Sequence, residues 1–189
     1  MSDEFILSGK KLPIILVENY LPDVLKKELL SQVQSLNWTP FINRWKKPAK
    51  RNHWIGGKSY NFSGMTHEHE EMSGPILDLL TRINTQCKSN LNGCYGNKYL
   101  NNSVKLGCHS DDEKQLNQSS IIVSYSLGVS RRLWFKDKET GEELGIILPD
   151  NSLFIMIPPC QILYSHSVKE DSDLPNGVRY SLTFREFIS

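Results

Sequence analysis

The part of the chain after Asn92 is a succession of short strand-like runs, and this pattern most strongly limits the folds available. The runs are rich in β-branched and aromatic residues, and turn sequences with Gly, Pro, Asn or Asp separate them. They cover residues 119–127, 131–137, 144–149, 152–158, 162–168 and 178–187. Many short strands at this spacing indicate a sandwich or a barrel, so we expect a jelly-roll half.

Two helices are predicted before these strands. Apolar residues recur at three- and four-residue steps over residues 22–38, where Asp23 is a plausible N-cap. A second apolar stripe predicts a helix that runs from Gly74 to about Leu91, with Ser73 as its cap. Helices followed by a strand-rich half define an α+β chain.

The segment between the helices is polar, aromatic and basic, and its sequences at 56–57 and 63–64 predict turns between short strands. A chain of 189 residues is long enough to bury a core and short enough to form one domain. We therefore expect a single domain over 1–189, with the helices in about 1–92 and the strand-rich core in about 93–189.

Composition limits the binding partners and the cellular location to be expected for the protein. The formal net charge of +1 gives no overall attraction to nucleic acid or membrane. The four cysteines form no CxxC pair, which argues against a disulfide framework or a thiolate zinc site; Cys108 is expected to be buried. No secretory signal and no apolar run of about 18–20 residues are visible. We expect an intracellular protein, with nucleus and cytoplasm not distinguished.

The sequence "CHSDDE" at 108–113 offers a possible metal site. His109 and Asp111 are two residues apart, so on a strand both side chains leave the same face. Taken alone, such a pair is better explained as a polar loop. His166, inside the apolar strand-like run "ILYSHSV", supplies a third ligand. Two histidines and one carboxylate form the facial triad of non-haem iron(II) oxygenases.

The last strand-like run offers buried cations for an anionic co-substrate. Arg179 and Arg185 have the same parity, so they project from one face together with Ser181 and Thr183. The pair could converge on the two ends of a short dicarboxylate such as 2-oxoglutarate, with bidentate geometry. A solvated outer face is the competing interpretation, but the neighbouring His and HxD sequences favour the site.

With these residues in place, the sequence resembles the AlkB-like 2-oxoglutarate- and Fe(II)-dependent dioxygenases from about Leu12 to Phe187. The motifs that carry the resemblance are, in order, "RNHWIGGKSYNFSG", "GNKYLNNSVKLGCHSDDE", "SSIIVSYSLGVSRR", "NSLFIM", "YSHSV" and "RYSLTFR". The resemblance implies a jelly-roll (double-stranded β-helix) core with N-terminal helices and a nucleotide-recognition lid.

The resemblance also implies the residues that hold the cofactors. The Fe(II) ligands would be His109, Asp111 and His166. The residues that hold 2-oxoglutarate would be Asn97, Tyr99, Arg179, Ser181 and Arg185. Among these, Arg179 would pair with the distal carboxylate and Arg185 with the carboxylate nearest the metal.

Substrate contacts are implied by the same likeness. Tyr60 and Phe62 match aromatics of the lid, and Phe62 would stack the target base opposite His109. Asp112 and Glu113 would contact the exocyclic amine of the base. Lys50 and Arg51 lie in "KKPAKR", next to Trp45 and Trp54, and would contact the nucleic-acid backbone; a nuclear-import signal or a solvated run are alternatives. "HEHEE" at 67–71 is interpreted as a polar linker.

The implied reaction is oxidative demethylation of N-alkylated bases such as 1-methyladenine and 3-methylcytosine in DNA or RNA. Fe(II) is the cofactor and 2-oxoglutarate and O2 are co-substrates; the products are formaldehyde, succinate and CO2. A 2-oxoglutarate oxygenase of a protein or lipid substrate and a non-catalytic nucleic-acid-binding module remain alternatives. The expected partner is alkylated DNA or RNA, with no membrane and no obligate protein partner, and the protein is expected to be a monomer.

Three positions depart from the family pattern. Ser181 stands where many relatives have Asn, so we expect a further hydrogen bond to 2-oxoglutarate to be weaker or shifted. Pro158-Pro159 replaces a more typical Gly-Gly, and Asn151 replaces a Gly before the "SLFIM" run. Asn tolerates positive φ, so we expect the turn at Asn151 to survive.

Overall fold

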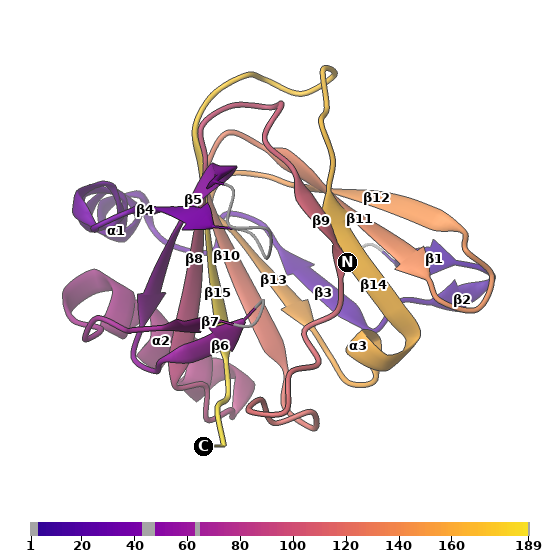
Figure 1. Ribbon diagram of the computed structural model, residues 1–189, viewed down its shortest axis with the longest axis horizontal. Coiled ribbons are helices and arrows are strands. Elements are labelled where there is room, and N and C mark those ends of the chain that lie inside the picture. Colours follow the sequence, from indigo (N-terminus) through magenta and orange to yellow (C-terminus); the bar gives the residue numbers. More distant parts are fainter. Residues whose placement is uncertain (1–3, 43–47, 63–64, 189) are drawn as a thin grey trace.

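Two antiparallel sheets face each other, and two helices cover the outer side of the larger one (Figure 1). The computed structural model describes residues 4–42, 48–62 and 65–188, with only the backbone described for 48–50, 60–62 and 65–67. The helices are α1 (Asp23–Ser35), α2 (Gly74–Cys87) and the single turn α3 (Cys160–Leu163). None of the described helices is both long enough and apolar enough to span a bilayer.

The larger sheet has seven strands, and the smaller has four, within the described residues. In spatial order the larger sheet contains β3 (Ile14–Val17), β13 (Ser152–Met156), β10 (Ile122–Gly128), β15 (Arg179–Arg185), β8 (Gly93–Tyr99), β5 (Pro48–Gly56) and β4 (Thr39–Ile42). The smaller contains β12 (Glu143–Leu148), β11 (Arg131–Asp137), β14 (Tyr164–Val168) and β9 (Leu106–His109). Two hairpins pair β1 (Ile6–Leu7) with β2 (Lys10–Lys11) and β6 (Tyr60–Phe62) with β7 (Met65–His67).

The helices form as the apolar periodicity predicts, but their ends differ from the prediction. The N-cap of α1 is Pro22, so the expected cap Asp23 is its first helical residue. Ser73 is the N-cap of α2, yet its side chain makes no capping bond. Instead Gln32 of α1 accepts a hydrogen bond from the backbone N–H of Ile76 at 2.9 Å. A side chain of α1 therefore provides a hydrogen-bond acceptor for a backbone N–H in the first turn of α2, which has no partner within its own helix.

The second helix ends earlier than predicted, at Cys87 rather than about Leu91. Lys88 adopts a left-handed conformation with φ 53°, which terminates the helix. Asn84 then bonds both backbone groups of Leu91, accepting at 2.9 Å and donating at 2.8 Å. These side-chain bonds replace the helical ones over the last residues.

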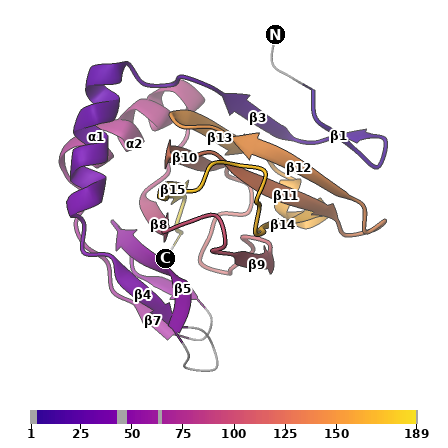
Figure 2. The same ribbon diagram turned by 90° about the horizontal axis from the view of Figure 1, so that it is seen from above.

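Each predicted strand-like run contains a strand, although the run 162–168 starts late because α3 occupies its first two residues. The turn at 56–57 is confirmed, with Gly57 at φ 81°, while the turn expected at 63–64 lies outside the described residues. Strands β3, β4 and β5 precede residue 93 and still belong to the larger sheet. The sheet thus unites both halves of the chain (Figure 2).

Two apolar cores lie on opposite faces of the larger sheet. Between the helices and the sheet, buried side chains include Leu29, Val33 and Ile83 of the helices and Leu182 and Phe184 of β15. A second apolar core lies between the two sheets. Its largest members are Tyr99, Phe135, Phe154 and Tyr164. The polar residues of the site described below lie at the open end of this second core.

The turn before β13 depends on one asparagine. Asn151 has φ 58°, as the sequence predicts for an Asn in place of Gly. Its Oδ1 accepts hydrogen bonds from the Leu21 backbone N–H at 2.9 Å and from the Tyr125 hydroxyl at 2.6 Å. Its Nδ2 donates to the Leu21 carbonyl at 2.8 Å. One side chain thus ties the start of α1 to β10 and β13.

We expect Asn151→Ala to lower the free energy of unfolding by about 2–4 kcal/mol, because buried hydrogen-bonding groups lose their partner. Asn19, at φ 51° and exposed, is the matched control, since Asn19→Ala costs only the backbone strain. Urea denaturation of both variants measures the difference. Equal losses in the two variants would contradict the role given to the Asn151 side chain.

Candidate functional site

A cavity opens between the two sheets and holds most of the polar residues that the sequence singles out. Its empty space is about 640 Å³, including the open mouth. Strands β8 and β15 of the larger sheet form one wall, and β11 and β14 of the smaller sheet form another. The polar or charged side chains that line it are Arg51, Asn97, His109, Asp111, Ser124, His166, Arg179, Ser181, Thr183 and Arg185.

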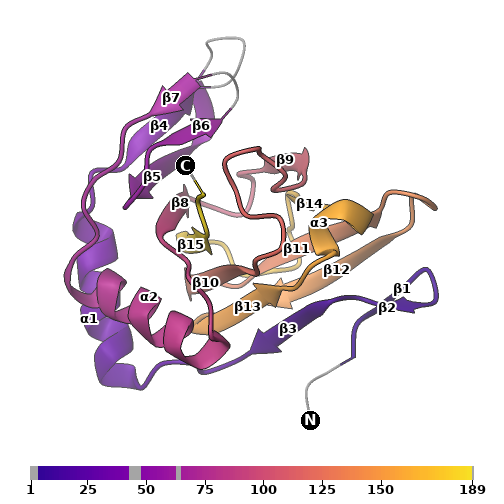
Figure 3. The same cartoon turned by 90° about the horizontal axis from the view of Figure 1, so that it is seen from below.

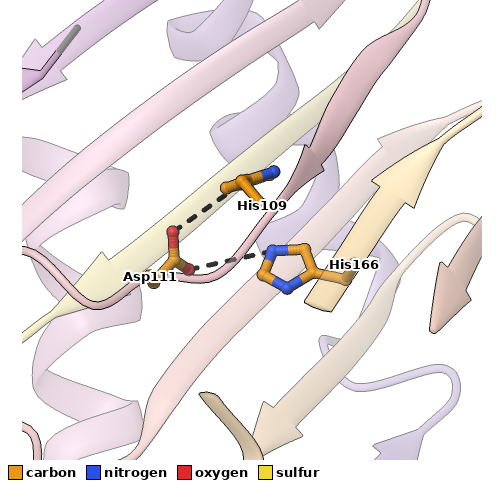
Figure 4. Close-up of side chains that lie close together, drawn as sticks. All are labelled: His109, Asp111 and His166. Atoms are coloured by element: carbon orange, nitrogen blue, oxygen red, sulfur yellow. Dashed lines mark ion pairs between the residues drawn. The ribbon is translucent and has the colours of Figure 1, made fainter. Parts of the chain in front are cut away.

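The three predicted metal ligands lie together at this cavity (Figure 4). One ligand atom from each of His109, Asp111 and His166 lies within 4.8 Å of the others. The Nε2 atoms of His109 and His166 are 3.8 Å and 4.0 Å from the two carboxylate oxygens of Asp111. The imidazole ring centroids are 4.4 Å apart. The pairing of β14 with β9 places His166 directly opposite His109.

Hydrogen bonds fix the orientation of these side chains. The Nδ1–H of His109 donates to the Gly107 carbonyl at 2.8 Å, which leaves Nε2 turned toward Asp111. Strand β9 ends at His109, so Asp111 lies beyond it and not on a common strand as expected. The Asp111 backbone N–H is held instead by Gln161 Oε1 at 2.9 Å. The turn at α3 therefore places the carboxylate.

The electrostatics of the cluster favour metal binding. Burial by itself would raise the pKa of Asp111, but the Arg185 guanidinium and the two histidines outweigh it and hold the pKa well below its usual range. Burial, and then the proximity of His109, lowers the pKa of His166 to about 3. A neutral imidazole and an ionised carboxylate are the forms that bind a metal ion.

The residues fit a divalent iron ion. Two imidazole nitrogens and one carboxylate oxygen are the donor set of non-haem Fe(II) oxygenases. The Oδ2 atom of Asp111 is buried and has no hydrogen-bond partner among the described residues. A buried carboxylate oxygen without a partner is costly unless an ion satisfies it. That atom faces His166.

The arginine pair projects into the same cavity, as the parity of the strand predicts. Arg185 donates to Asp111 Oδ1 at 2.8 Å. Arg179 donates to the Ser126 hydroxyl at 2.9 Å and lies 5.4 Å from the ring centroid of Tyr99. No carboxylate lies within 4.0 Å of Arg179 in the described parts of the chain, and burial lowers its pKa. The solvated-face interpretation is excluded, because both arginines are buried.

The other residues assigned to the co-substrate line the same wall. The register of β8 and β15 pairs Tyr99 with Arg179 and Asn97 with Ser181. Ser181 shares its hydroxyl with Ser124 at 2.9 Å. Tyr95 lies on the same face of β8 and lines the cavity, although it is absent from the predicted site. The alternation of "YGNKY" was the signal that would have placed Tyr95 beside Asn97.

Arg51 lies elsewhere than predicted. The sequence predicts a contact with the nucleic-acid backbone from a basic surface run, but Arg51 is only 5% exposed and lines the cavity. Strand β5 alternates, so Arg51 points inward and its guanidinium donates to the Asn97 side-chain oxygen. The side chains of Lys50, Tyr60 and Phe62 lie outside the described residues, as does Trp45.

The residues that follow Asp111 do not line the cavity. Asp112 is exposed and Glu113 is half-buried. The expectation that Cys108 is buried is wrong: Cys108 is exposed and bonds the Ser165 hydroxyl at 3.1 Å. Its neighbour His109 faces the cavity, so strand alternation turns Cys108 outward. In "HEHEE", His69 bonds Ser59 at 2.9 Å.

Comparison with known proteins agrees with this geometry. The family model of the 2OG-Fe(II) oxygenase superfamily matches residues 14–185, and the chain belongs to this superfamily. Fe(II), 2-oxoglutarate and O2 are therefore its cofactor and co-substrates, and the predicted dioxygenase class and AlkB-like resemblance are confirmed.

Individual relatives share less than a third of their residues with this chain. The DNA oxidative demethylase ALKBH2 of Mus musculus is 26% identical over 180 residues, which cover 88% of this chain and 75% of the relative. ALKBH2 of Homo sapiens is 28% identical over 179 residues, which cover 87% of this chain and 66% of the relative. The solved structure of OsALKBH1 has a TM-score of 0.68 at 16% identity and covers 93% of this chain and 98% of that one. The predicted jelly-roll core is thereby confirmed.

Loss of the carboxylate ligand should weaken metal binding. We expect Asp111→Ala to raise the Kd for Mn(II) by about 100-fold or more, because even residues that only support a ligand contribute about 10- to 100-fold. Electron paramagnetic resonance of free Mn(II) measures the Kd. The exposed neighbour is the control, and Asp112→Ala should leave the Kd unchanged. Equal effects of the two substitutions would contradict the site.

Acid should destabilise the metal-free protein through His166. Its folded pKa of about 3 lies below the unfolded value of 6.5, so between these values only the unfolded chain takes up the proton. The stabilisation is complete above pH 6.5 and is lost as the pH falls, with a slope of up to about 1.4 kcal/mol per pH unit.

Urea denaturation in EDTA between pH 7.5 and 5 measures this slope. We expect His166→Gln to reduce it, whereas His69→Gln on the surface should preserve it. An unchanged slope in His166→Gln would show that the imidazole is not buried in its neutral form.

Proposed function

We propose that the protein removes N-methyl groups oxidatively from alkylated bases in DNA or RNA, such as 1-methyladenine and 3-methylcytosine. The observation that carries the proposal is the buried ligand cluster at an arginine-lined cavity. It stands in a chain whose sequence relatives include DNA oxidative demethylases. The chain spans between 62% and 75% of the length of three such relatives, so their activity is carried over here only as a proposal.

The roles of the site residues follow from their positions. His109, Asp111 and His166 would hold Fe(II), whose chemistry is the activation of O2 with 2-oxoglutarate as the reductant. Arg185 contacts a metal ligand, which supports its pairing with the co-substrate carboxylate nearest the metal. Arg179, at the other end of β15, is the corresponding cation for the distal carboxylate. Buried guanidinium groups favour bidentate pairing with carboxylates.

Ser181, Asn97 and Tyr99 would complete the co-substrate site from the same wall. The seryl hydroxyl is shorter than the asparagine amide of many relatives and already bonds Ser124. Its contribution to holding the co-substrate would therefore be weaker, and more of the polar contacts would fall to β8. The apolar lining of β11 and β13 keeps water away from the reacting methyl group.

The substrate side of the site is assigned to the segment around β6 and β7 and to the residues after Asp111. Figure 3 shows that the β6–β7 hairpin stands near the β4–β5 edge of the larger sheet, while β9 lies across from it. Tyr60 and Phe62 would form the stacking part of a nucleotide lid, with Lys50 near the backbone. Asp112, which is exposed, and Glu113 would contact the exocyclic amine of the base.

We also infer a single domain over 1–189, because strands from both halves share one sheet. The proposed partner is alkylated DNA or RNA, and we propose a monomer with no obligate protein partner. A protein or lipid substrate is the alternative that the following experiment distinguishes.

The test uses oligonucleotides with one 1-methyladenine or 3-methylcytosine, as single- and double-stranded DNA and RNA. With Fe(II), 2-oxoglutarate and ascorbate, we expect the loss of one methylene mass in mass spectra, and Asp111→Ala should abolish it. Asp112→Ala should lower kcat/KM about tenfold while the Mn(II) affinity is kept, because it would remove one charge-assisted hydrogen bond.

The reverse result would redirect the search. Consumption of 2-oxoglutarate by the wild-type protein without loss of methyl groups from any oligonucleotide would exclude the demethylase proposal. It would point to a protein or lipid substrate for the same oxygenase chemistry.

A further inference from the structure

Arg51 is a buried cation, and one of its polar partners is a residue assigned to the co-substrate. It lies on β5, which pairs with β8 on the side away from β15. Its guanidinium lies 4.0 Å from the ring centroid of Phe41. The whole residue is 5% exposed. Its Nη1 donates a hydrogen bond to Asn97 Oδ1. No carboxylate lies within 4.0 Å of Arg51 in the residues that the structure describes.

This hydrogen bond decides which end of the Asn97 amide faces the cavity. A side-chain amide has one carbonyl oxygen that accepts and one NH2 group that donates. Because Arg51 binds the oxygen, the NH2 group is left for the cavity, which Asn97 lines. Within the described part of the chain, no group accepts a hydrogen bond from this NH2. An NH2 group attracts a carboxylate, whereas a carbonyl oxygen in its place would repel one.

We propose that Arg51 is a positioning residue for 2-oxoglutarate: it holds the Asn97 amide so that the NH2 group donates to a carboxylate of the co-substrate. The inference rests on the co-substrate role of Asn97 in the proposed function. The ring of Phe41 supports the guanidinium from one side, so the donor is fixed before the co-substrate arrives.

The orientation of the Asn97 amide matters more because residue 181 is a serine, whose side chain is shorter than that of asparagine. Asn97 and Ser181 are direct partners in the register of β8 and β15. A serine offers one hydroxyl, and that hydroxyl is shared with Ser124 at 2.9 Å. Asn97 is therefore the amide donor that this part of the wall presents, and its orientation bears directly on the affinity for a dicarboxylate.

The experiment measures binding and not turnover. Calorimetric titration of 2-oxoglutarate into protein loaded with Mn(II) in place of Fe(II) gives the Kd without oxidation. We expect Arg51→Met and Asn97→Ala each to raise this Kd about tenfold, the value of one hydrogen bond to a charged group. In the double variant the two effects should not multiply, because both residues act mainly through one hydrogen bond.

A matched control removes the same charge elsewhere. Arg132 of β11 is half-buried, pairs with Asp171 at 2.9 Å and is not among the cavity residues. Arg132→Met should leave the Kd for 2-oxoglutarate unchanged. The Kd for Mn(II) should remain unchanged in all of these variants, which separates orientation of the amide from collapse of the site.

A second substitution keeps the test valid if Arg51→Met does not fold. Asn97→Asp retains an oxygen that accepts from Arg51 but removes the NH2 group, so the Kd should rise at least as far as in Asn97→Ala. An unchanged Kd in Asn97→Asp would overturn the inference.

The outcomes also distinguish the inference from the proposal beneath it. If Asn97→Ala weakens binding but Arg51→Met does not, or if their effects multiply in the double variant, the inference on Arg51 alone is overturned. If Asn97→Ala binds 2-oxoglutarate as the wild type does, the co-substrate role of Asn97 is overturned as well.

Discussion

The ion pair between Arg185 and Asp111 joins the two halves of the site, and the rest of the arrangement depends on it. Arg185 ends β15 of the larger sheet, and Asp111 follows β9 of the smaller one. Burial alone would favour the protonated carboxyl, but the guanidinium at 2.8 Å keeps it ionised. The guanidinium binds Oδ1 of Asp111, and the other carboxylate oxygen, Oδ2, faces His166. One contact therefore links the metal ligands to the wall assigned to the co-substrate.

The cavity wall formed by β8 and β15 presents its polar side chains in only one register of the two strands. Pairing of β15 with β8 puts Tyr99 beside Arg179 and Asn97 beside Ser181 on the cavity face. The alternate residues, such as Leu182 and Phe184, are fully buried against the helices. A slip of one residue would move the arginines into that apolar core and the apolar side chains into the cavity. Packing of the helices thus protects the chemistry on the opposite face.

The strands and the ligand set could be predicted from the sequence because both depend on local patterns. Alternation placed Arg179 and Arg185 on one face, and the apolar run around His166 marked a strand that faces the interior. The position of Arg51 could not be read in this way. A basic run such as "KKPAKR" resembles a solvated surface, and only the pairing of β5 with β8 turns this arginine inward. The early end of α2 likewise required the side chain of Asn84, which no periodicity reports.

The net charge of the cavity lining affects the binding of both the co-substrate and the proposed substrate. Without the two metal-binding histidines, the charged lining residues are three guanidiniums (Arg51, Arg179 and Arg185) and one carboxylate (Asp111), which gives a net charge of +2. A dianion matches this charge, but a divalent metal adds +2, so the cavity with both bound stays positive. The substrate proposed above, a base that methylation has made cationic, would be repelled by that field. Asp112 and Glu113 directly follow the ligand Asp111 in the sequence and lie outside the cavity lining. In the proposed function their carboxylates would oppose this repulsion.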